Sequence, residues 1–305
     1  MVKAAIFLWD RRRKENPVNT KDTYFQDFFT ALPTLSGCHA PGSKVHTFLK
    51  TTLRAAVVRY FQTVDQTPKS FGPFGDLVFP YQRMGAVDSL NLFDLDELIL
   101  FSFYWVNRHR YRRVADIGAN LGLHAILLSR CGFEVTAYEP DPRHFGILKE
   151  NLLLNDCQEV KKVNAAVSSV AGVQEFVRVL GNTTGNHLAG SKPHAYGELE
   201  RFPVEVVPVS SILEDSDLIK MDVEGHEREL LLSTRGGDWD HTDALVEVGS
   251  LENASAIFEH FSRLGVGLFS QKINWGRVMD LAHMPVSYRE GILFISRKDR
   301  MPWDE

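Results

Sequence analysis

After about residue 110, short runs of apolar, β-branched residues alternate with stretches whose apolar positions recur at helical spacing. Such alternation is typical of βαβ units, which build a parallel sheet with helices on both faces. Asp141 followed by Pro142 marks one helix start, because proline has no N–H to leave unpaired. We therefore predict a doubly wound α/β domain, with strands at 113–117, 134–138, 160–167, 173–179, 204–209, 218–221, 244–248, 266–271 and 291–296, and helices at 121–130, from 142, near 225–233 and at 254–264.

Before residue 110 the pattern is helical and aromatic. Ser43 is placed to cap a helix that runs to about Phe61, and glycines and prolines interrupt the pattern between residues 68 and 80. Asp94 followed by Glu97 resembles a capping box that opens a helix through about residue 106. We predict an N-terminal, mainly helical cap over residues 1–92 and an α/β domain over residues 93–305.

The 305-residue chain is 44% hydrophobic and 24% charged, as in ordinary folded proteins. Its three cysteines show no paired or metal-like spacing, which indicates reduced thiols in a cytosolic setting. The net charge of −5 argues weakly against a protein built to hold nucleic acid. The N-terminal apolar run is short and precedes its basic cluster, unlike a signal peptide, and no stretch approaches the roughly 20 apolar residues of a membrane span. These features predict a cytoplasmic protein without a membrane span.

The clearest chemical signal is a glycine-rich turn between the first predicted strand and the first predicted helix. Gly118 and Gly122 carry no side chains, so the backbone there can approach a bound ligand closely. Asp116 lies two residues before the turn and can accept a hydrogen bond from an ammonium group. Glu139 follows Asp116 by 23 residues, at the end of the second strand, where a carboxylate can bind both ribose hydroxyls.

A dinucleotide-binding site is the main competitor for this turn. Its fingerprint is G-x-G-x-x-G, whereas three residues separate Gly118 from Gly122 here. Asp116 would also repel a pyrophosphate, but its charge suits the ammonium group of a methionine moiety. The pattern therefore favours S-adenosylmethionine over a dinucleotide.

Four motifs occur in order along the chain: VADIGANLGLHAI from residue 114, YEPDP from 138, NAAVS from 164 and LIKMDVEGHE from 218. Together they resemble the FkbM family of methyltransferases over about residues 93–296. The resemblance implies a class I, Rossmann-like methyltransferase fold, S-adenosyl-L-methionine as cofactor, and methylation of hydroxyl groups on sugars and natural products. Carried over position by position, it implies cofactor contacts from Asp116, Gly118, Ala119, Asn120, Gly122, Glu139, Pro140, Asn164, Ala165 and Asp222, with Asn164 near the adenine.

Three further residues are candidates for catalysis. Asp222 ends a buried strand at the carboxyl edge of the predicted sheet, where ligands bind in open α/β folds. Methyl transfer to a hydroxyl needs a base, which Asp222 or His226 is placed to supply, although either can instead belong only to a helix start. Glu247 lies in an apolar strand, where an unpaired charge is costly, so we expect it to serve a site or to pair with a cation.

The loop at residues 181–187 is rich in small hydrogen-bonding groups. Asn182, Thr183 and His187 are candidate contacts to a polar acceptor, and a plain turn is the alternative. Glu224 is a further candidate contact, unless it only stabilises the positive end of a helix.

The leading prediction is an O-methyltransferase that acts on a small hydroxylated molecule. A nucleic-acid methyltransferase would favour a basic face and an Asn-Pro-Pro-aromatic motif, where this chain has Asp-Val-Glu-Gly at residues 222–225. A cofactor-binding protein without acceptor chemistry is the non-enzymatic alternative. Asp222, Glu224 and Glu247 offer oxygen ligands for magnesium, but nothing fixes a ligand geometry and the histidines lack zinc spacing, so we predict no metal site. We expect the N-terminal cap to cover the acceptor pocket or to form a contact in a homo-oligomer.

Overall fold

An eight-stranded sheet with the order β15-β14-β16-β13-β12-β5-β6-β7 forms the centre of the computed structural model, which describes residues 23–182, 185–191 and 197–303. The strands from β13 to β7 are parallel, whereas β16 runs antiparallel between β13 and β14. The predicted doubly wound α/β fold is confirmed. The strands are β5 (Arg113–Ile117), β6 (Glu134–Tyr138), β7 (Lys161–Val163), β12 (Leu218–Met221), β13 (Asp243–Glu247), β14 (Gly267–Ser270), β15 (Gly276–Arg277) and β16 (Ile292–Ser296).

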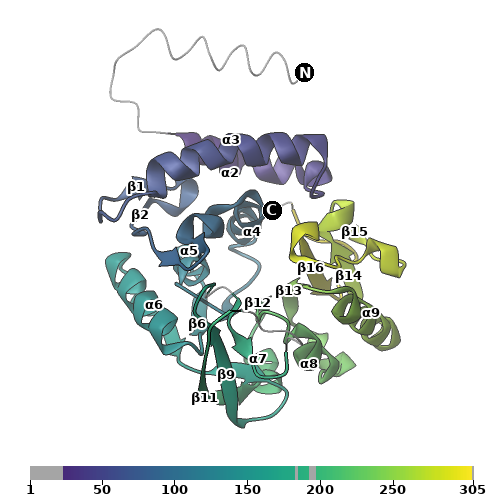
Figure 1. The fold of residues 1–305 in the computed structure, drawn as a ribbon. Coiled ribbons are helices and arrows are strands. Elements are labelled where there is room, and N and C mark those ends of the chain that lie inside the picture. Colours follow the sequence, from purple (N-terminus) through teal and green to yellow (C-terminus); the bar gives the residue numbers. More distant parts are fainter. Residues whose placement is uncertain (1–22, 183–184, 192–196, 304–305) are drawn as a thin grey trace.

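Helices cover both faces of this sheet (Figure 1). Successive residues of β5 point to opposite faces, so that Val114 joins one hydrophobic core and Ala115 the other. The core around Val114 contains α4 (Leu95–Val106), α5 (Leu123–Arg130) and α6 (Pro142–Leu154). The core around Ala115 contains α7 (Val209–Asp215), α8 (Glu227–Leu232) and α9 (Leu251–Leu264), and Gly265 ends α9 in a left-handed conformation as predicted.

The N-terminal part is helical, as expected, and packs on α4 (Figure 1). It contains α2 (Tyr24–Thr34) and α3 (Lys44–Phe61), and the Ser43 hydroxyl caps α3 by accepting from the backbone N–H of His46 at 3.1 Å. Aromatic rings join it to the rest, with Phe61 stacked on Phe93 at a centroid distance of 4.2 Å. The described part of this extension therefore shares one core with the eight-stranded sheet, and the division near residue 92 stays a prediction.

The start of α4 differs from the predicted capping box. Asp94 accepts a hydrogen bond from Leu95 N, as a helix cap does. The Glu97 carboxylate instead lies 2.9 Å from Nε2 of His124 on α5, whose Nδ1 is 2.9 Å from the Tyr104 hydroxyl. Because α4 packs on α5, the buried imidazole of His124 lies within reach of Glu97, and this carboxylate links the two helices instead of capping α4.

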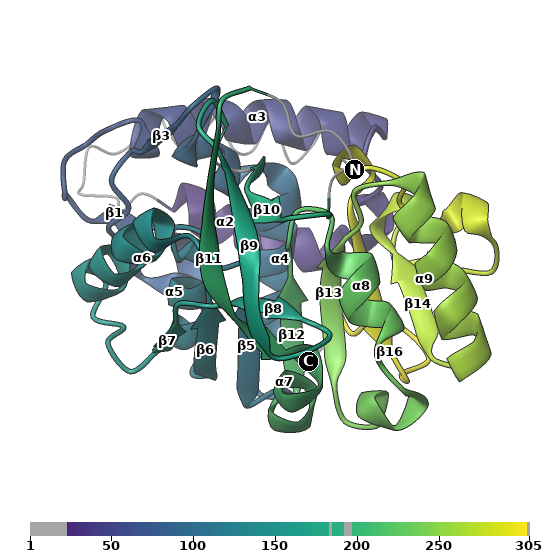
Figure 2. The same cartoon turned by 60° about the horizontal axis from the view of Figure 1, so that its bottom comes forward.

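The predicted third strand is divided into two strands that belong to different sheets. β7 stays in the large sheet, whereas β8 (Ala166–Ser168) joins a four-stranded sheet with the order β10-β9-β11-β8. The chain bends between them at Asn164, whose amide donates to the carbonyl oxygens of Glu139 and Pro140 at 2.8 and 3.1 Å. The other strands of this four-stranded sheet, which we call the insert sheet, are β9 (Gly172–Val179), β10 (His187–Leu188) and β11 (Leu199–Pro208). Figure 2 shows β9 and β11 as a long hairpin in front of the large sheet.

The tip of the β9–β11 hairpin contacts the N-terminal part of the chain (Figure 2). Ala86 N donates to Gly181 O at 2.7 Å, beside a bridge between Gly85 and Asn182. Gly85 has a φ of 81°, and a Cβ at this position would lie 2.2 Å from Gly181 O, so only glycine fits. Short strands complete the N-terminal part: β1 (Lys69–Ser70), β2 (Asp76–Leu77), β3 (Arg83–Met84) and β4 (Val87–Asp88).

None of the helices in the described part of the chain is long and apolar enough to cross a membrane.

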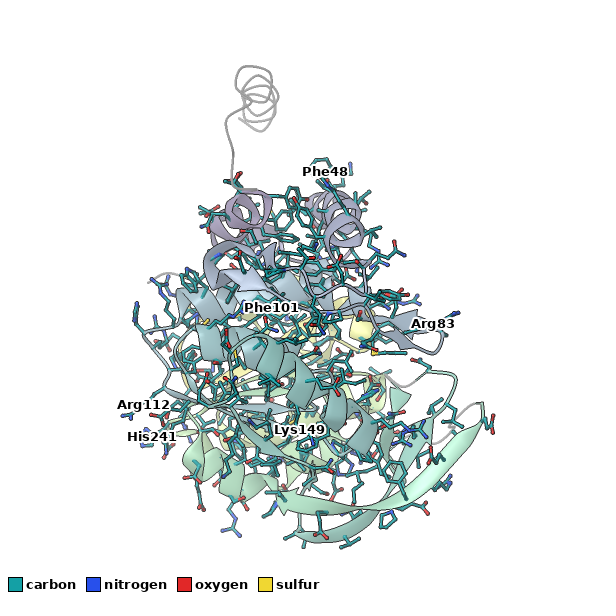
Figure 3. The ribbon with its side chains drawn as sticks, turned by 90° about the vertical axis from the view of Figure 1, so that its left-hand side faces the viewer. Phe48, Arg83, Phe101, Arg112, Lys149 and His241 are labelled. Atoms are coloured by element: carbon teal, nitrogen blue, oxygen red, sulfur yellow. The ribbon has the colours of Figure 1, made fainter. Side chains whose placement is uncertain are left out.

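The continuous core predicts that the helical part and the sheet unfold together. Figure 3 shows Phe101 of α4 in the interior and Phe48 of α3 on the outer surface, where Phe48 is 59% exposed. We expect Phe101→Ala to lower the free energy of unfolding by about 3–5 kcal/mol, because it leaves a cavity in the core. Phe48→Ala is the matched control and should change this free energy by less than about 0.5 kcal/mol. Urea unfolding followed by circular dichroism measures both, and equal losses would contradict this account of the core.

Candidate functional site

A pocket with about 610 Å³ of open space lies at the carboxyl ends of β5, β6 and β12. The insert sheet forms its opposite wall through Phe176, Asn186, His187 and Leu188. The predicted site residues that line it are Gly118, Asn120, Glu139, Pro140, Ala165, His187, Asp222, Glu224 and His226. The topology thus brings together residues from four separate motifs at one sheet edge.

The turn after β5 fits this edge only because Gly118 lacks a side chain. Gly118 has a φ of 77°, and a Cβ there would lie 1.8 Å from the carbonyl oxygen of Asp222. The backbone N–H groups of Gly118 and Ala119 both donate to Tyr138 O, at 3.0 and 2.9 Å. Gly122 also has a positive φ, of 87°, but it begins α5 against Leu148 and does not line the pocket. The glycines therefore shape the turn, and Gly118 alone of the two reaches the pocket.

The Glu139 carboxylate is held by backbone donors at the end of β6. Asn120 N donates to its Oε2 and Asp141 N to its Oε1, both at 2.8 Å. Burial raises the pKa of Glu139 to about 8, against the effect of these two N–H groups. The buried Oδ1 of Asn120 has no hydrogen-bond donor within the described ranges. Glu139 and Asn120 therefore offer a carboxylate and an amide oxygen as acceptors to a ligand that carries hydroxyl or amino groups.

Asn164 holds the same turn from outside the pocket. Its amide group donates to the carbonyl oxygens of Glu139 and Pro140, and its side chain is not part of the pocket lining. The neighbouring Ala165 does line the pocket. A contact between Asn164 and an adenine stays a prediction.

Asp116 lies beneath the pocket, next to a buried lysine that the sequence reasoning missed. Lys220 pairs with Asp116 across neighbouring parallel strands, and its Nζ is 3.6 Å from Asp116 Oδ1. The same Nζ is 3.8 Å from Asp222 Oδ2 and donates to Gly118 O at 3.1 Å. Burial alone would lower the pKa of Lys220, but the charges of Asp116 and Asp222 outweigh it and raise that pKa. A lysine within the apolar run LIKM was the available signal.

This placement bears on the predicted role of Asp116. The residue is fully buried, does not line the pocket, and accepts no hydrogen bond from the residues that the structure describes. Asp222 is the carboxylate of this group that lines the pocket. A direct contact between Asp116 and the ammonium group of a ligand stays a prediction.

The loop after β12 presents Asp222 and Glu224 to the pocket in a strained conformation. Glu224 and Gly225 have φ values of 55° and 104°, and α8 (Glu227–Leu232) follows them, within the predicted range of 225–233. Asp222 is thus not the helix cap. Glu227, which we did not predict as a site residue, accepts from Val223 N at 3.2 Å and from Gly225 N at 3.1 Å, both at its Oε1. Burial raises the pKa of Glu227 to about 7.

His226 lines the pocket between two serine hydroxyls. Its Nε2 is 2.9 Å from Ser168 Oγ, and its Nδ1 is 2.9 Å from Ser191 Oγ. Burial lowers the pKa of His226, which favours the neutral imidazole. Both ring nitrogens are therefore engaged by neighbours, and its role as a base stays a prediction.

Glu247 ends β13 but does not line the pocket. Burial raises its pKa well above the ordinary value, and the nearby charges of Asp222 and Glu224 raise it further. These effects favour a protonated carboxyl group, which suits a hydrogen-bond donor better than a base. Its predicted catalytic role stays a prediction.

The predicted acceptor loop is spread over the insert sheet. Asn182 lies at the hairpin tip, His187 lies in β10 with its Nδ1 2.8 Å from Gly185 O, and Thr183 is outside the described residues. No group of three histidine, cysteine or acidic side chains in the described ranges is arranged to hold a metal ion.

Comparison with known proteins identifies the family of the segment that carries this pocket. Residues 116–265 match the model of a family described as the methyltransferase FkbM domain, and this segment runs from the end of β5 through α9. The α/β domain belongs to the FkbM methyltransferase family. The sequence resemblance is confirmed, and so is S-adenosyl-L-methionine as the cofactor of the FkbM domain.

A curated relative, methyltransferase sdnD from Sordaria araneosa, is 29% identical over an alignment of 171 residues, and the match covers 44% of this chain and 64% of that protein. The chain thus matches just under two thirds of the length of this relative. Two solved structures are similar at low scores. They are the S-adenosylhomocysteine-bound methyltransferase PaMTH1 of Podospora anserina (12% identity, 66% of this chain, 79% of that one, TM-score 0.33) and the putative RNA methyltransferase PH1948 of Pyrococcus horikoshii (13% identity, 81% and 95%, TM-score 0.35).

Glu227 should hold the Asp222 loop of the FkbM domain in place. Glu227→Ala removes the acceptor for two backbone N–H groups, so we expect a loss of about 1–3 kcal/mol in stability and at least about tenfold in S-adenosylmethionine affinity. Glu227→Gln keeps an oxygen at Oε1 and should stay within about threefold of the original affinity. Thermal unfolding and calorimetry measure the two effects, and an alanine variant that behaves like the glutamine variant would remove this role.

Ligand affinity should depend on the ionisation of Glu139. Ribose hydroxyls donate to the ionised carboxylate, so affinity for 5′-methylthioadenosine, which lacks the methionine ammonium group, should rise with pH through the pKa of about 8. We expect at least about a fivefold gain between pH 6.5 and 9, because the ionised fraction grows over this range. Glu139→Gln should bind more weakly with a flat profile. A falling profile for the unmodified protein would contradict the assignment.

Proposed function

We propose that the FkbM domain transfers the methyl group of S-adenosylmethionine to a hydroxyl group of a sugar or another small natural product. The observation that carries the proposal is the arrangement of two carboxylates in one pocket, with Glu139 at the end of β6 and Asp222 at the end of β12. The cofactor supplies a methyl group made electrophilic by its bond to a positively charged sulfur. Everything else in the reaction depends on binding, orientation and proton transfer by the protein.

Glu139 is the proposed anchor for the cofactor ribose. Its two oxygens already accept one backbone N–H each, which fixes the plane of the carboxylate before any ligand arrives. A carboxylate oxygen has further lone pairs for the hydroxyl donors of a ribose. Beside Glu139, the backbone of the pocket residues Gly118 and Pro140 can approach the bound cofactor closely.

Asp222 is the proposed general base for the acceptor hydroxyl. It lines the pocket, and Lys220 lies behind it, where the ammonium group orients one carboxylate oxygen. A base within hydrogen-bond reach of the acceptor contributes about 10²–10⁴-fold to such a proton transfer. The neutral imidazole of His226, which lines the pocket, is proposed to help hold the acceptor rather than to take its proton, and Glu247 lies outside the pocket lining.

A nucleic-acid acceptor is less compatible with this pocket. Asp222 and Glu224 both line it, and carboxylates in the lining repel the phosphates that dominate nucleic-acid binding. The insert wall also adds apolar contacts, from Phe176 and Leu188, that suit a small molecule. We therefore favour a small, uncharged hydroxylated acceptor.

We also propose that the reaction takes place in the cytoplasm. Cys38, Cys131 and Cys157 are free thiols in the structure, and free thiols are typical of reducing compartments.

Substitution of Asp222 tests the chemical step. Asp222→Asn keeps the size of the side chain but cannot take a proton, so turnover should fall about 10²–10⁴-fold while S-adenosylmethionine affinity stays within about threefold. S-adenosylhomocysteine release, screened over a panel of sugars and hydroxylated natural products, reports turnover, and calorimetry reports affinity. Asp215→Asn, at an 87% exposed carboxylate, is the control and should remain fully active. A fully active Asp222→Asn would reject Asp222 as the base, and an absence of cofactor binding would reject the proposed function.

A further inference from the structure

A buried arginine of the insert sheet contacts the turn that carries Glu139. Arg178 lies on β9 and is only 3% exposed. Its guanidinium group binds Asp141 with two hydrogen bonds, from Nε to Oδ2 at 2.7 Å and from Nη2 to Oδ1 at 2.6 Å. Its remaining Nη1 donates to Oε2 of Glu200 on β11 at 2.6 Å. Arg178 therefore joins two strands of the insert sheet to a residue that follows β6.

A second insert residue binds the same carboxylate. Asn186 donates through Nδ2 to Asp141 Oδ2 at 2.8 Å, and its Oδ1 accepts from Val179 N at 2.9 Å. Asn186 is itself part of the pocket wall. The insert thus presents three donors to one buried carboxylate, and two of them form a planar, bidentate pair that fixes its orientation.

Asp141 in turn sets the position of the Glu139 carboxylate. Its backbone N–H donates to Glu139 Oε1 at 2.8 Å, and its side chain accepts from Arg143 N at 2.8 Å as the cap of α6. Two successive contacts therefore lead from the insert sheet through Asp141 to the Glu139 carboxylate, which belongs to a residue of the pocket lining.

Stability alone does not account well for this arrangement. Burying an arginine and a carboxylate costs several kcal/mol of desolvation, which their attraction offsets only when the geometry is very good. What the contacts to Asp141 do provide is a fixed position for the neighbouring Glu139 carboxylate. Arg201 on β11 and Glu175 on β9 form a comparison pair between the same two strands, but these side chains are about half exposed and far less constrained.

We propose that Arg178 and Asn186 are positioning residues for the cofactor, which act through Asp141 to fix the Glu139 carboxylate against the ribose. This inference rests on the proposed function. It makes the insert sheet a working part of the cofactor site as well as a wall of the pocket. Loss of either residue should weaken the hydrogen bonds between Glu139 and the ribose hydroxyls and leave the contacts to the rest of the cofactor in place.

Two ligands that differ only at the ribose test this role. 5′-Methylthioadenosine carries both ribose hydroxyls, and its 2′,3′-dideoxy counterpart carries neither. Arg178→Lys and Asn186→Ala should each weaken binding of 5′-methylthioadenosine about tenfold and change binding of the dideoxy compound by less than about twofold. Arg201→Ala, which breaks the exposed pair between the same strands, should leave both affinities unchanged. Circular dichroism checks that each variant is folded. If Arg178→Lys does not fold, Asn186→Ala alone tests the proposal.

A double-mutant cycle with Glu139→Gln completes the experiment. If Arg178 acts through Glu139, then Arg178→Lys should weaken 5′-methylthioadenosine binding by less than about twofold in the Glu139→Gln background. Equal weakening of both ligands, unchanged affinities, or a full effect in the Glu139→Gln background would each overturn the inference and leave Arg178 a purely structural residue. The unmodified protein separates this result from the proposed function, because a protein that binds no S-adenosylmethionine would refute the function itself.

Discussion

The ammonium group of Lys220 holds the two central strands of this site together. It lies between the carboxylates of Asp116 and Asp222 and donates to the carbonyl oxygen of Gly118. A buried lysine without these partners would be costly, and so would Asp116, which depends on that charge for its compensation. The turn after β5 and the loop after β12 can therefore approach as closely as they do only while this group is in place. Gly118 makes the close approach of the turn to the Asp222 carbonyl oxygen sterically possible, because it has no Cβ.

Carboxylates around the pocket are oriented mainly by backbone N–H groups. Glu139 receives two of them from different turns, and Glu227 receives two from the loop that carries Asp222. Backbone donors are rigid compared with side chains, so they fix a carboxylate without the entropy cost of ordering a long partner. Burial opposes the ionised state of both acids and raises their pKa values into the range around neutral pH. The site thus combines fixed geometry with sensitivity to protonation.

The insert sheet completes the pocket, and the described N-terminal part contacts the insert sheet without lining the pocket. The insert sheet supplies one wall, and its hairpin tip bonds to the segment around Gly85 from the N-terminal region. That region in turn shares its aromatic core with α4. No described residue before Ile117 lines the pocket, so the cap over the acceptor pocket stays a prediction, as does a homo-oligomer.

The sequence by itself determined most of the longer helices and strands and the type of turn, because these depend on local chemistry. Ser43, Asp141 and Gly265 mark helix ends through their own caps, and the glycine turn at Gly118 is readable because few other residues adopt its φ. Only the tertiary structure decided which side chains meet. Strand order set Lys220 beside Asp116, and the packing of α4 on α5 brought Glu97 to His124. The bend at Asn164 sent β8 into a second sheet and so brought Arg178 to Asp141, 37 residues away in the sequence. A buried charge must find a partner wherever the fold places one, and a local pattern does not contain that information.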